Sequence, residues 1–282
     1  MDAWRIFTPQ SVPEIYAALR DATPQHDREV NRWVFRGQAD VCWPLRPSLA
    51  RIVAGLGAEA IAGRERLALE RFAREAHLVL DATTLPPRDN DPTKWWSLMQ
   101  HYGAATRLLD WSYSPYVALY YACTERPDAD GAIWIVDVGA VADRTRERHA
   151  HILRPDGSML FPWFSTDGDG SVIHFQEPWR QTDRMAVQQG LHSFATDPTA
   201  DHDAILASLF GERPQRWTSK VIVPSKLKRP CTAHLRKLNV SGRGLLPGAD
   251  GLGARAKELV QSAQADELAV LGVPGAERWW DP

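Results

Sequence analysis

The residues best suited to chemistry fall in three short blocks, and the first is FRGQ at residues 35–38. The guanidinium of Arg36 is always charged and binds a carboxylate or a phosphate through two parallel hydrogen bonds. Gly37 beside it has no side chain, so that another group can approach the backbone closely. We therefore expect Arg36 either to form an ion pair with a residue such as Asp110 or to hold an anionic ligand.

The second block, residues 100–115, contains amide, imidazole, phenol, guanidinium, carboxylate, indole and hydroxyl groups within one apolar stretch. Packing alone does not require so many polar types, because each must find a hydrogen bond once it is buried. The third block, residues 184–190, contributes Arg184 and Gln188. Taken singly, each of these side chains is more often structural. Because the three blocks share this polar character, we expect Arg36, the second block and Gln188 to lie together in one concave site.

These three blocks carry a resemblance to a known family. FRGQ at 35–38, QHYGAATRLLDWSYSPYVALYYA at 100–122 and RMAVQQG at 184–190 resemble the signature blocks of the FRG domain family, which is named for its Phe-Arg-Gly. Weaker similarity runs from about residue 4 to 263, although LLPGADGL at 245–252 departs from the acidic form expected there. The resemblance implies one FRG domain over residues 1–264, followed by a tail over residues 265–282.

The Arg-Gly strand end of this family is similar to the first motif of ADP-ribosyltransferases, in which an arginine holds a phosphate or ribose of NAD. The resemblance implies NAD as a substrate, with Arg36, Asp110 and Gln188 as catalytic residues. A glutamine cannot offset positive charge as a carboxylate does, so Asp110 or Glu177 would supply the negative charge. The residues that the resemblance implies for NAD binding are Arg36, Gln38, His101, Tyr102, Arg107, Trp111 and Ser114.

Composition limits the class of protein. The chain has 282 residues, of which 44% are hydrophobic and 24% charged, and these values are typical of globular proteins and not of disordered ones. Its apolar runs are too short to span a membrane, and its first ten residues do not read as a secretory signal, so we expect a cytoplasmic protein. Three scattered cysteines argue against disulfides and a zinc site, and no metal site is expected.

Charge points to one candidate surface for a macromolecular partner. The net charge is −2, but residues 213–243 contain only basic charges, with Lys226, Lys228 and Arg229 at their centre. Such a run is more often a solvated face than a binding site. If it does bind a partner, nucleic acid is the class that its charge favours.

The pattern of elements predicts an α+β fold with a mixed, mostly antiparallel sheet flanked by helices, similar to that of ADP-ribosyltransferases. Residues 106–109 should be extended, and residues 184–190 and 191–194 should form two short strands broken at Gly190. The other predicted strands cover residues 31–36, 131–138, 172–175 and 220–223. The predicted helices cover residues 12–22, 59–80, 93–103, 116–124, 225–238 and 252–263.

Three hypotheses about function follow. The first is an NAD-binding, ADP-ribosyltransferase-like enzyme that modifies a nucleic acid or a protein, and the resemblance suggests a bacterial toxin or phage-defence system. The second is a non-catalytic sensor or binding module that holds an anionic nucleotide or nucleic acid through Arg36, Arg107 and the basic segment. The third, a nuclease or nucleotide hydrolase, needs grouped acidic metal ligands. Only loop residues such as Asp128 and Asp130 come close to that requirement.

Overall fold

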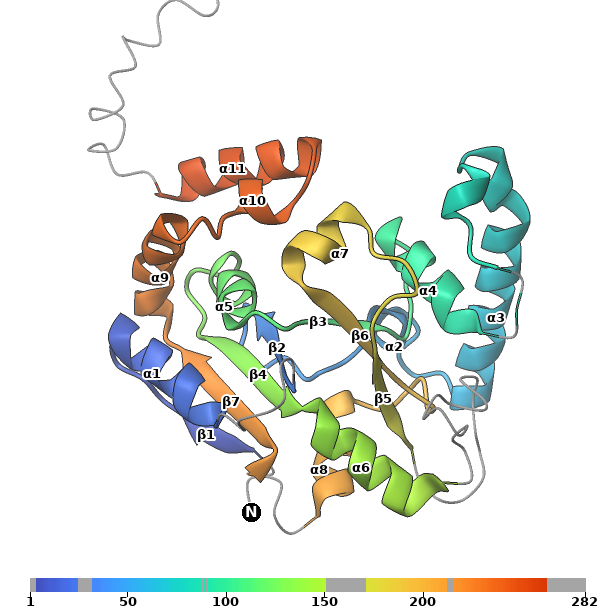
Figure 1. Ribbon diagram of the computed structural model, residues 1–282, viewed down its shortest axis with the longest axis horizontal. Coiled ribbons are helices and arrows are strands. Elements are labelled where there is room, and N and C mark those ends of the chain that lie inside the picture. Colours follow the sequence, from blue (N-terminus) through green and yellow to red (C-terminus); the bar gives the residue numbers. More distant parts are fainter. Residues whose placement is uncertain are drawn as a thin grey trace, which may run out of the picture.

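The computed structural model describes residues 4–24, 32–87, 89, 91–150, 171–211 and 216–262 (Figure 1). Within these residues one sheet of seven strands is antiparallel except for the pairing of its edge strand β1 with β7. The predicted α+β class with a mixed, mostly antiparallel sheet is thus confirmed. In sheet order the strands are β1 (Arg5–Phe7), β7 (Thr218–Val223), β4 (Gly131–Asp137), β2 (Trp33–Gln38), β3 (Leu109–Ser112), β6 (Gly190–Ala195) and β5 (Ile173–Gln176).

Helices cover both faces of this sheet. Helices α1 (Val12–Ala22), α5 (Pro115–Cys123) and α9 (Ser225–Lys237) enclose one hydrophobic core with β2, β4 and β7. Helices α6 (Val138–His149) and α8 (His202–Phe210) enclose a second core on the opposite face. Both cores bury aliphatic and aromatic side chains, the main favourable contribution to folding.

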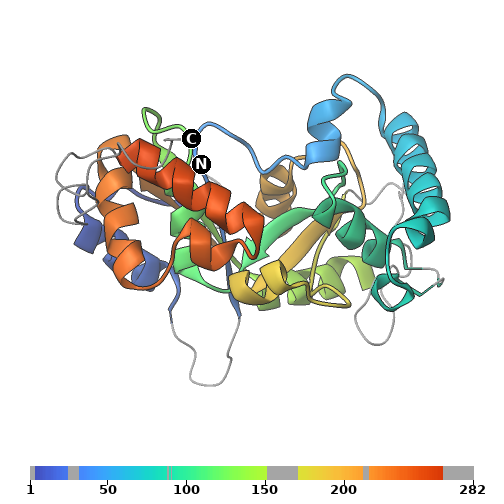
Figure 2. The same ribbon diagram turned by 90° about the horizontal axis from the view of Figure 1, so that it is seen from above.

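The remaining helices form two groups that rise from the sheet on either side of β3 and α7 (Figure 2). One group is α2, α3 and α4, and the other is α10 with α11. Their bounds are α2 (Ser48–Ile52), α3 (Ala58–Glu75), α4 (Pro92–His101), α7 (Asp183–Gln188), α10 (Gly242–Leu245) and α11 (Ala249–Ser262), with short 3₁₀ turns η1 (Ala76–Leu78) and η2 (Ala82–Thr84) after α3.

Local signals predict several elements correctly. The hydroxyl of Ser11 accepts a hydrogen bond from the backbone of Glu14 at the start of α1, as the capping pattern predicts. Ser114 caps α5 in the same way, with Pro115 in the first turn. Strand β4 is buried along its whole length, as its continuous apolar run predicts.

Other predictions are wrong. The first of the two strands predicted around Gly190 is instead helix α7, which Thr182 caps and Gln189 ends in a left-handed conformation with φ of 49°. The extended segment near residue 106 becomes a strand only from Leu109, and α6 and α8 have no predicted counterpart. The tail over residues 265–282 lies outside the described residues.

Gly37 explains how α5 reaches the sheet. A Cβ atom at this position would lie 1.8 Å from the carbonyl oxygen of Ala118 in α5, which is far closer than two such atoms can come. The helix therefore packs directly on the backbone of β2, which confirms the close approach expected at this glycine. Arg36, the residue before it, is held at a fixed place near the end of the strand.

In the part of the chain that the structure describes, no helix combines the length and the apolar character needed to cross a bilayer. Cys123 and Cys231 are buried with free thiols, and Cys42 is exposed and also free.

Candidate functional site

Arg36 and Asp110 meet where strands β2 and β3 separate. The two strands pair only at Phe35 and Ser112 and diverge beyond that point. Strand alternation sends Arg36 toward the face of α6 and α8 and sends Asp110 toward the opposite face. The guanidinium nevertheless reaches the gap, where its Nη1 donates a hydrogen bond of 2.6 Å to the carbonyl oxygen of Asp110. The contact joins Arg36 to a backbone atom and not to the carboxylate.

The Asp110 carboxylate is held in place by two neighbours. Gln100 Nε2 in α4 donates to it at 2.6 Å, and His192 Nε2, directly across in β6, lies 3.3 Å away. The protein around the Asp110 carboxylate removes part of its solvent, which would raise its pKa, but His192, through its hydrogen bond and charge, and then the charges of Arg36 and Arg184 lower that pKa to about 2. The side chain is 53% exposed. Asp110 is therefore an accessible carboxylate that stays ionised at neutral pH and cannot serve as a proton donor there.

One nitrogen of the Arg36 guanidinium has no hydrogen-bond partner in the described part of the chain. Its Nε is buried and has no hydrogen-bond partner among the described residues, in which no carboxylate lies within 4.0 Å of its guanidinium. Burial lowers the pKa of Arg36, while the charge of Asp110 raises it and the nearby charge of Arg51 lowers it. A desolvated cation next to a second cation is unfavourable on its own and becomes favourable when an anion binds between them.

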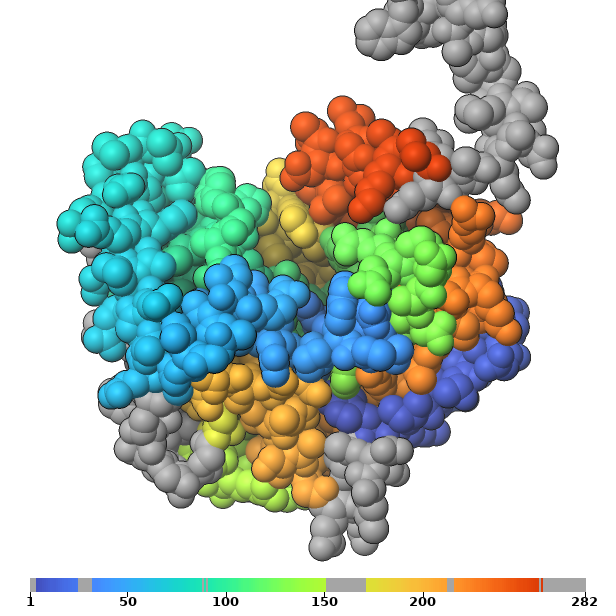
Figure 3. Space-filling view, turned by 180° about the vertical axis from the view of Figure 1, so that it is seen from behind, coloured from blue at the N-terminus to red at the C-terminus, as the bar shows by residue number. Residues whose placement is uncertain are grey.

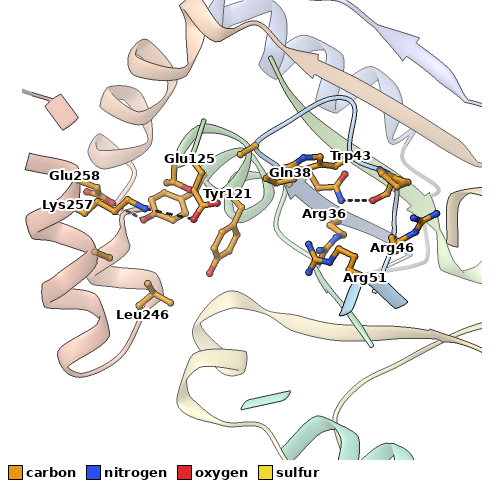
Figure 4. A pocket seen from close by; sticks show the side chains of 16 residues that line it. Arg36, Gln38, Trp43, Arg46, Arg51, Tyr121, Glu125, Leu246, Lys257 and Glu258 are labelled. Atoms are coloured by element: carbon orange, nitrogen blue, oxygen red, sulfur yellow. Dashed lines mark hydrogen bonds and ion pairs between the residues drawn. The ribbon is translucent and has the colours of Figure 1, made fainter. Parts of the chain in front are cut away.

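Arg36 lines a pocket of about 450 Å³ (Figure 4). Arg36, Arg51 and Trp43 lie toward one end of this pocket, and Lys257 and other α11 residues lie toward the other. From behind, the surface is hollowed between the segment around α2, in blue, and helices α10 and α11, in red (Figure 3). The volume is in the range of small-molecule binding sites.

Two predicted site residues fix the walls of this pocket. Gln38 lines it, and its side chain accepts a hydrogen bond from Trp134 Nε1 and donates one to the carbonyl of Pro44. Gln188 Nε2 donates to the hydroxyl of Tyr121, another pocket residue, at 2.7 Å and to the carbonyl of Leu245 at 2.9 Å. Both amides thus position neighbouring segments, and Gln188 connects α7 to the pocket.

Other predicted site residues have structural partners elsewhere. Trp111 is buried in the core against α6 and α8, and its Nε1 donates to Ser193. Ser114 caps α5. His101 and Tyr102 are exposed at the end of α4 and contact each other, with ring centroids 4.9 Å apart. None of these four lines the pocket around Arg36.

Arg107 is likewise placed in the core. Its guanidinium binds the carboxylate of Glu65, both side chains are 1% exposed, and further hydrogen bonds reach the carbonyls of Ala195 and Thr196. It also lies over the ring of Trp96.

Of the predicted site residues, Arg36 and Gln38 line the pocket, whereas Asp110 and Gln188 do not. Asp110 contacts Arg36 only through its backbone carbonyl, Gln188 contacts the pocket residue Tyr121, and Arg107 lies in a buried ion pair. The expected convergence on one concave site is therefore seen only for Arg36 and Gln38.

The structure adds residues that the sequence pattern does not indicate. His192 supports Asp110, and Tyr121, Trp43 and Arg51 line the pocket. A signal for His192 was present, because a polar side chain inside the buried strand GLHSFA must find a partner. Trp43 and Arg51 belong to an irregular segment and a short helix, where periodicity gives no information about direction.

A buried histidine makes stability depend on pH. Burial first, and then the charges of Arg36 and Arg107, lower the pKa of His202 from 6.5 to about 3. The unfolded chain binds this proton near pH 6.5 and the folded protein does not, so the free energy of unfolding should fall as the pH drops through this window. Between about pH 6.5 and pH 3, we expect the free energy of unfolding to decrease by up to about 1.4 kcal/mol for each pH unit. Urea unfolding at several pH values should show a weaker dependence in His202→Gln, and an unchanged slope would contradict this origin.

The basic segment is only partly available to a partner. Lys228 is buried, and its ammonium donates to the carbonyls of Ala39, Glu125 and Arg126, so it cannot contact a phosphate backbone. Lys226, Lys237 and Arg243 are exposed. Three members of the segment, residues 213–215, lie outside the described part.

Comparison with known proteins supports the resemblance over part of the chain. Residues 31–131 match the family model of the FRG domain. This range includes Arg36, Asp110 and the α5 residues that approach Gly37, so it covers the centre of the candidate site. No curated protein and no solved structure matches the chain. The fold and site define an α+β protein with a pocket that three arginines line at one end, and residues 31–131 are similar to the FRG domain.

Proposed function

We propose that this protein is an NAD-binding, ADP-ribosyltransferase-like enzyme that modifies a macromolecule. The observation that carries the proposal is Arg36, a partly buried guanidinium that lines a pocket, whose buried Nε has no partner and which has no carboxylate partner in the described structure. Its planar fork matches an oxygen pair of a phosphate. The pyrophosphate of NAD supplies such oxygens, and the backbone carbonyl of Asp110 accepts a hydrogen bond from this arginine.

The chemistry fits an electrostatic role for Asp110. In the transfer, the bond between the ribose C1′ and the nicotinamide nitrogen breaks, and neutral nicotinamide leaves with the electron pair. The ribose becomes positively charged, the acceptor atom bonds to C1′, and the acceptor proton passes to solvent. A carboxylate that is held by His192 and Gln100 and remains ionised would stabilise the developing positive charge.

A second candidate function is a non-catalytic module that binds an anionic nucleotide at the same pocket. It is favoured by Gln188, which is uncharged and is already bonded to Tyr121 and Leu245. No glutamate occupies that place, although a transferase would use one there. In this alternative Arg36 keeps its role and Asp110 has none in chemistry.

Nicotinamide release separates the two functions. The full chain is incubated with NAD and with DNA, RNA or protein acceptors, and nicotinamide is quantified by chromatography. The enzyme should release nicotinamide, and Asp110→Asn should slow release by roughly a hundredfold, a typical effect of losing one stabilising group. Binding of NAD without release under every acceptor condition would support the binding module, and absence of both binding and release would refute the enzyme and any module that is specific for NAD.

If the acceptor is nucleic acid, the exposed basic residues of α9 and α10 should set its affinity. Glutamate substitutions at Lys226, Lys237 and Arg243 should weaken binding and reduce its salt dependence, because each phosphate contact releases counterions. Arg64→Glu in α3 is the control for a charge change elsewhere on the surface. Affinities measured by fluorescence anisotropy at several salt concentrations test this prediction. Equal effects of the triple variant and the control would show that the segment is a solvated surface with no role in binding nucleic acid.

A further inference from the structure

We propose that the end of the pocket around Arg36 is a nucleoside diphosphate subsite, in which Arg36 and Arg51 hold the two phosphates and Trp43 stacks on the base. The inference rests on the proposed function and adds to it the substrate class and two residues. It places the base against Trp43, a residue that is not among those the resemblance implies for NAD binding.

Arg51 supplies the second phosphate ligand. Its side chain lines the same pocket wall as Arg36, and its charge is near enough to lower the pKa of Arg36 (Figure 4). It is exposed at the end of α2, and no described residue pairs with it. Arg46, the third arginine of this wall, is already bound by both carboxylate oxygens of Asp201 at 2.6 and 2.7 Å. Two guanidinium groups thus remain for two phosphates.

Trp43 supplies an aromatic surface at the same end. It lines the pocket and is 37% exposed, although large aromatic side chains are usually more deeply buried. In Figure 4 it lies beside Gln38 and above the arginines. Stacking of a base on an aromatic side chain contributes substantially to affinity and tolerates any base.

The segment that carries Trp43 is held rigidly. Gln38 Nε2 binds the carbonyl of Pro44, the backbone of Leu45 donates to Asp203, and Arg46 binds Asp201. These anchors connect the segment both to β2 and to α8. Trp43 and Arg36 are therefore positioned before any ligand arrives, which lowers the entropic cost of binding.

Calorimetric titration with inorganic pyrophosphate and with ADP tests the two roles separately. Arg51→Ala should weaken the affinity for both ligands by about tenfold or more, because both ligands contain the two phosphates. Trp43→Ala should weaken the affinity for ADP about tenfold and leave the affinity for pyrophosphate unchanged. Trp43→Phe should retain most of the affinity for ADP. Trp179→Ala, at a tryptophan that is 40% exposed and outside the pocket, is the matched control.

Each outcome decides the inference. Equal loss of ADP and pyrophosphate affinity in Trp43→Ala, or unchanged affinities in Arg51→Ala, would overturn it. If NAD binds in an Arg36-dependent manner while these variants behave like wild type, the proposed function stands and the subsite is wrong. If neither ADP nor NAD binds the wild-type chain, both fail. Melting temperatures of all variants identify any that do not fold, and Trp43→Phe then provides the decisive comparison.

Discussion

Replacing Arg36 with alanine is expected to weaken NAD binding by about a hundredfold or more and to change folding stability by only about 1 kcal/mol. Charged hydrogen bonds contribute about 1.5–3 kcal/mol each, and NAD would lose at least two of them. The folded protein would lose a single hydrogen bond to the Asp110 carbonyl and would no longer hold a partly buried charge near that of Arg51. Arg36→Lys keeps the charge but not the fork, so it should resemble Arg36→Ala in binding.

Calorimetry with NAD and thermal melting on the same protein samples measure these two effects. Arg20→Ala, at a side chain that is 78% exposed in α1, serves as the control. A structural role for Arg36 predicts the opposite pattern. A loss of roughly 3–5 kcal/mol, which is typical of breaking a buried ion pair, with NAD affinity retained by the remaining folded protein, would contradict our assignment.

Glu65→Ala should destabilise the protein by about 3–5 kcal/mol, because it leaves the charge of Arg107 buried without its carboxylate. The pair connects α3 to the segment before β3, and both side chains are 1% exposed. Urea unfolding should show this loss, and Glu65→Met combined with Arg107→Met should cost less than the two single changes together.

The surface ion pair between Arg144 and Glu147 in α6 is the matched comparison, since its side chains are 46% and 61% exposed. Glu147→Ala should change stability by less than about 1 kcal/mol. If Glu65→Ala reduced the stability as little as this control does, the buried charge of Arg107 would not need the Glu65 carboxylate. The prediction that Arg107 binds a ligand would then regain support.

The fold could be predicted where the sequence carries a strong local signal. Ser11 and Ser114 mark helix starts through their own hydroxyl groups, and the apolar run of β4 needs no knowledge of its neighbours. Helix α7 could not be distinguished from a strand by pattern, because six residues give less than two helical turns. Its identity depends on the cap at Thr182 and the left-handed turn at Gln189.

The site could be predicted only where one residue must find a particular partner. A permanently charged Arg36 beside a glycine pointed to the pocket, and its nearness to Asp110 follows from strand pairing. For Arg107 the same argument about charge held, but the partner was Glu65 in a helix forty-two positions earlier. Local sequence does not show which of several carboxylates or ligands a guanidinium meets.

A crystal structure of the protein grown with NAD is the most direct test of the account. We predict electron density for the pyrophosphate within hydrogen-bonding distance of Arg36, including its buried Nε, and the nicotinamide ribose near the Asp110 carboxylate. NAD bound elsewhere on the molecule, or a well-ordered pocket that stays free of NAD at saturating concentration, would contradict the account.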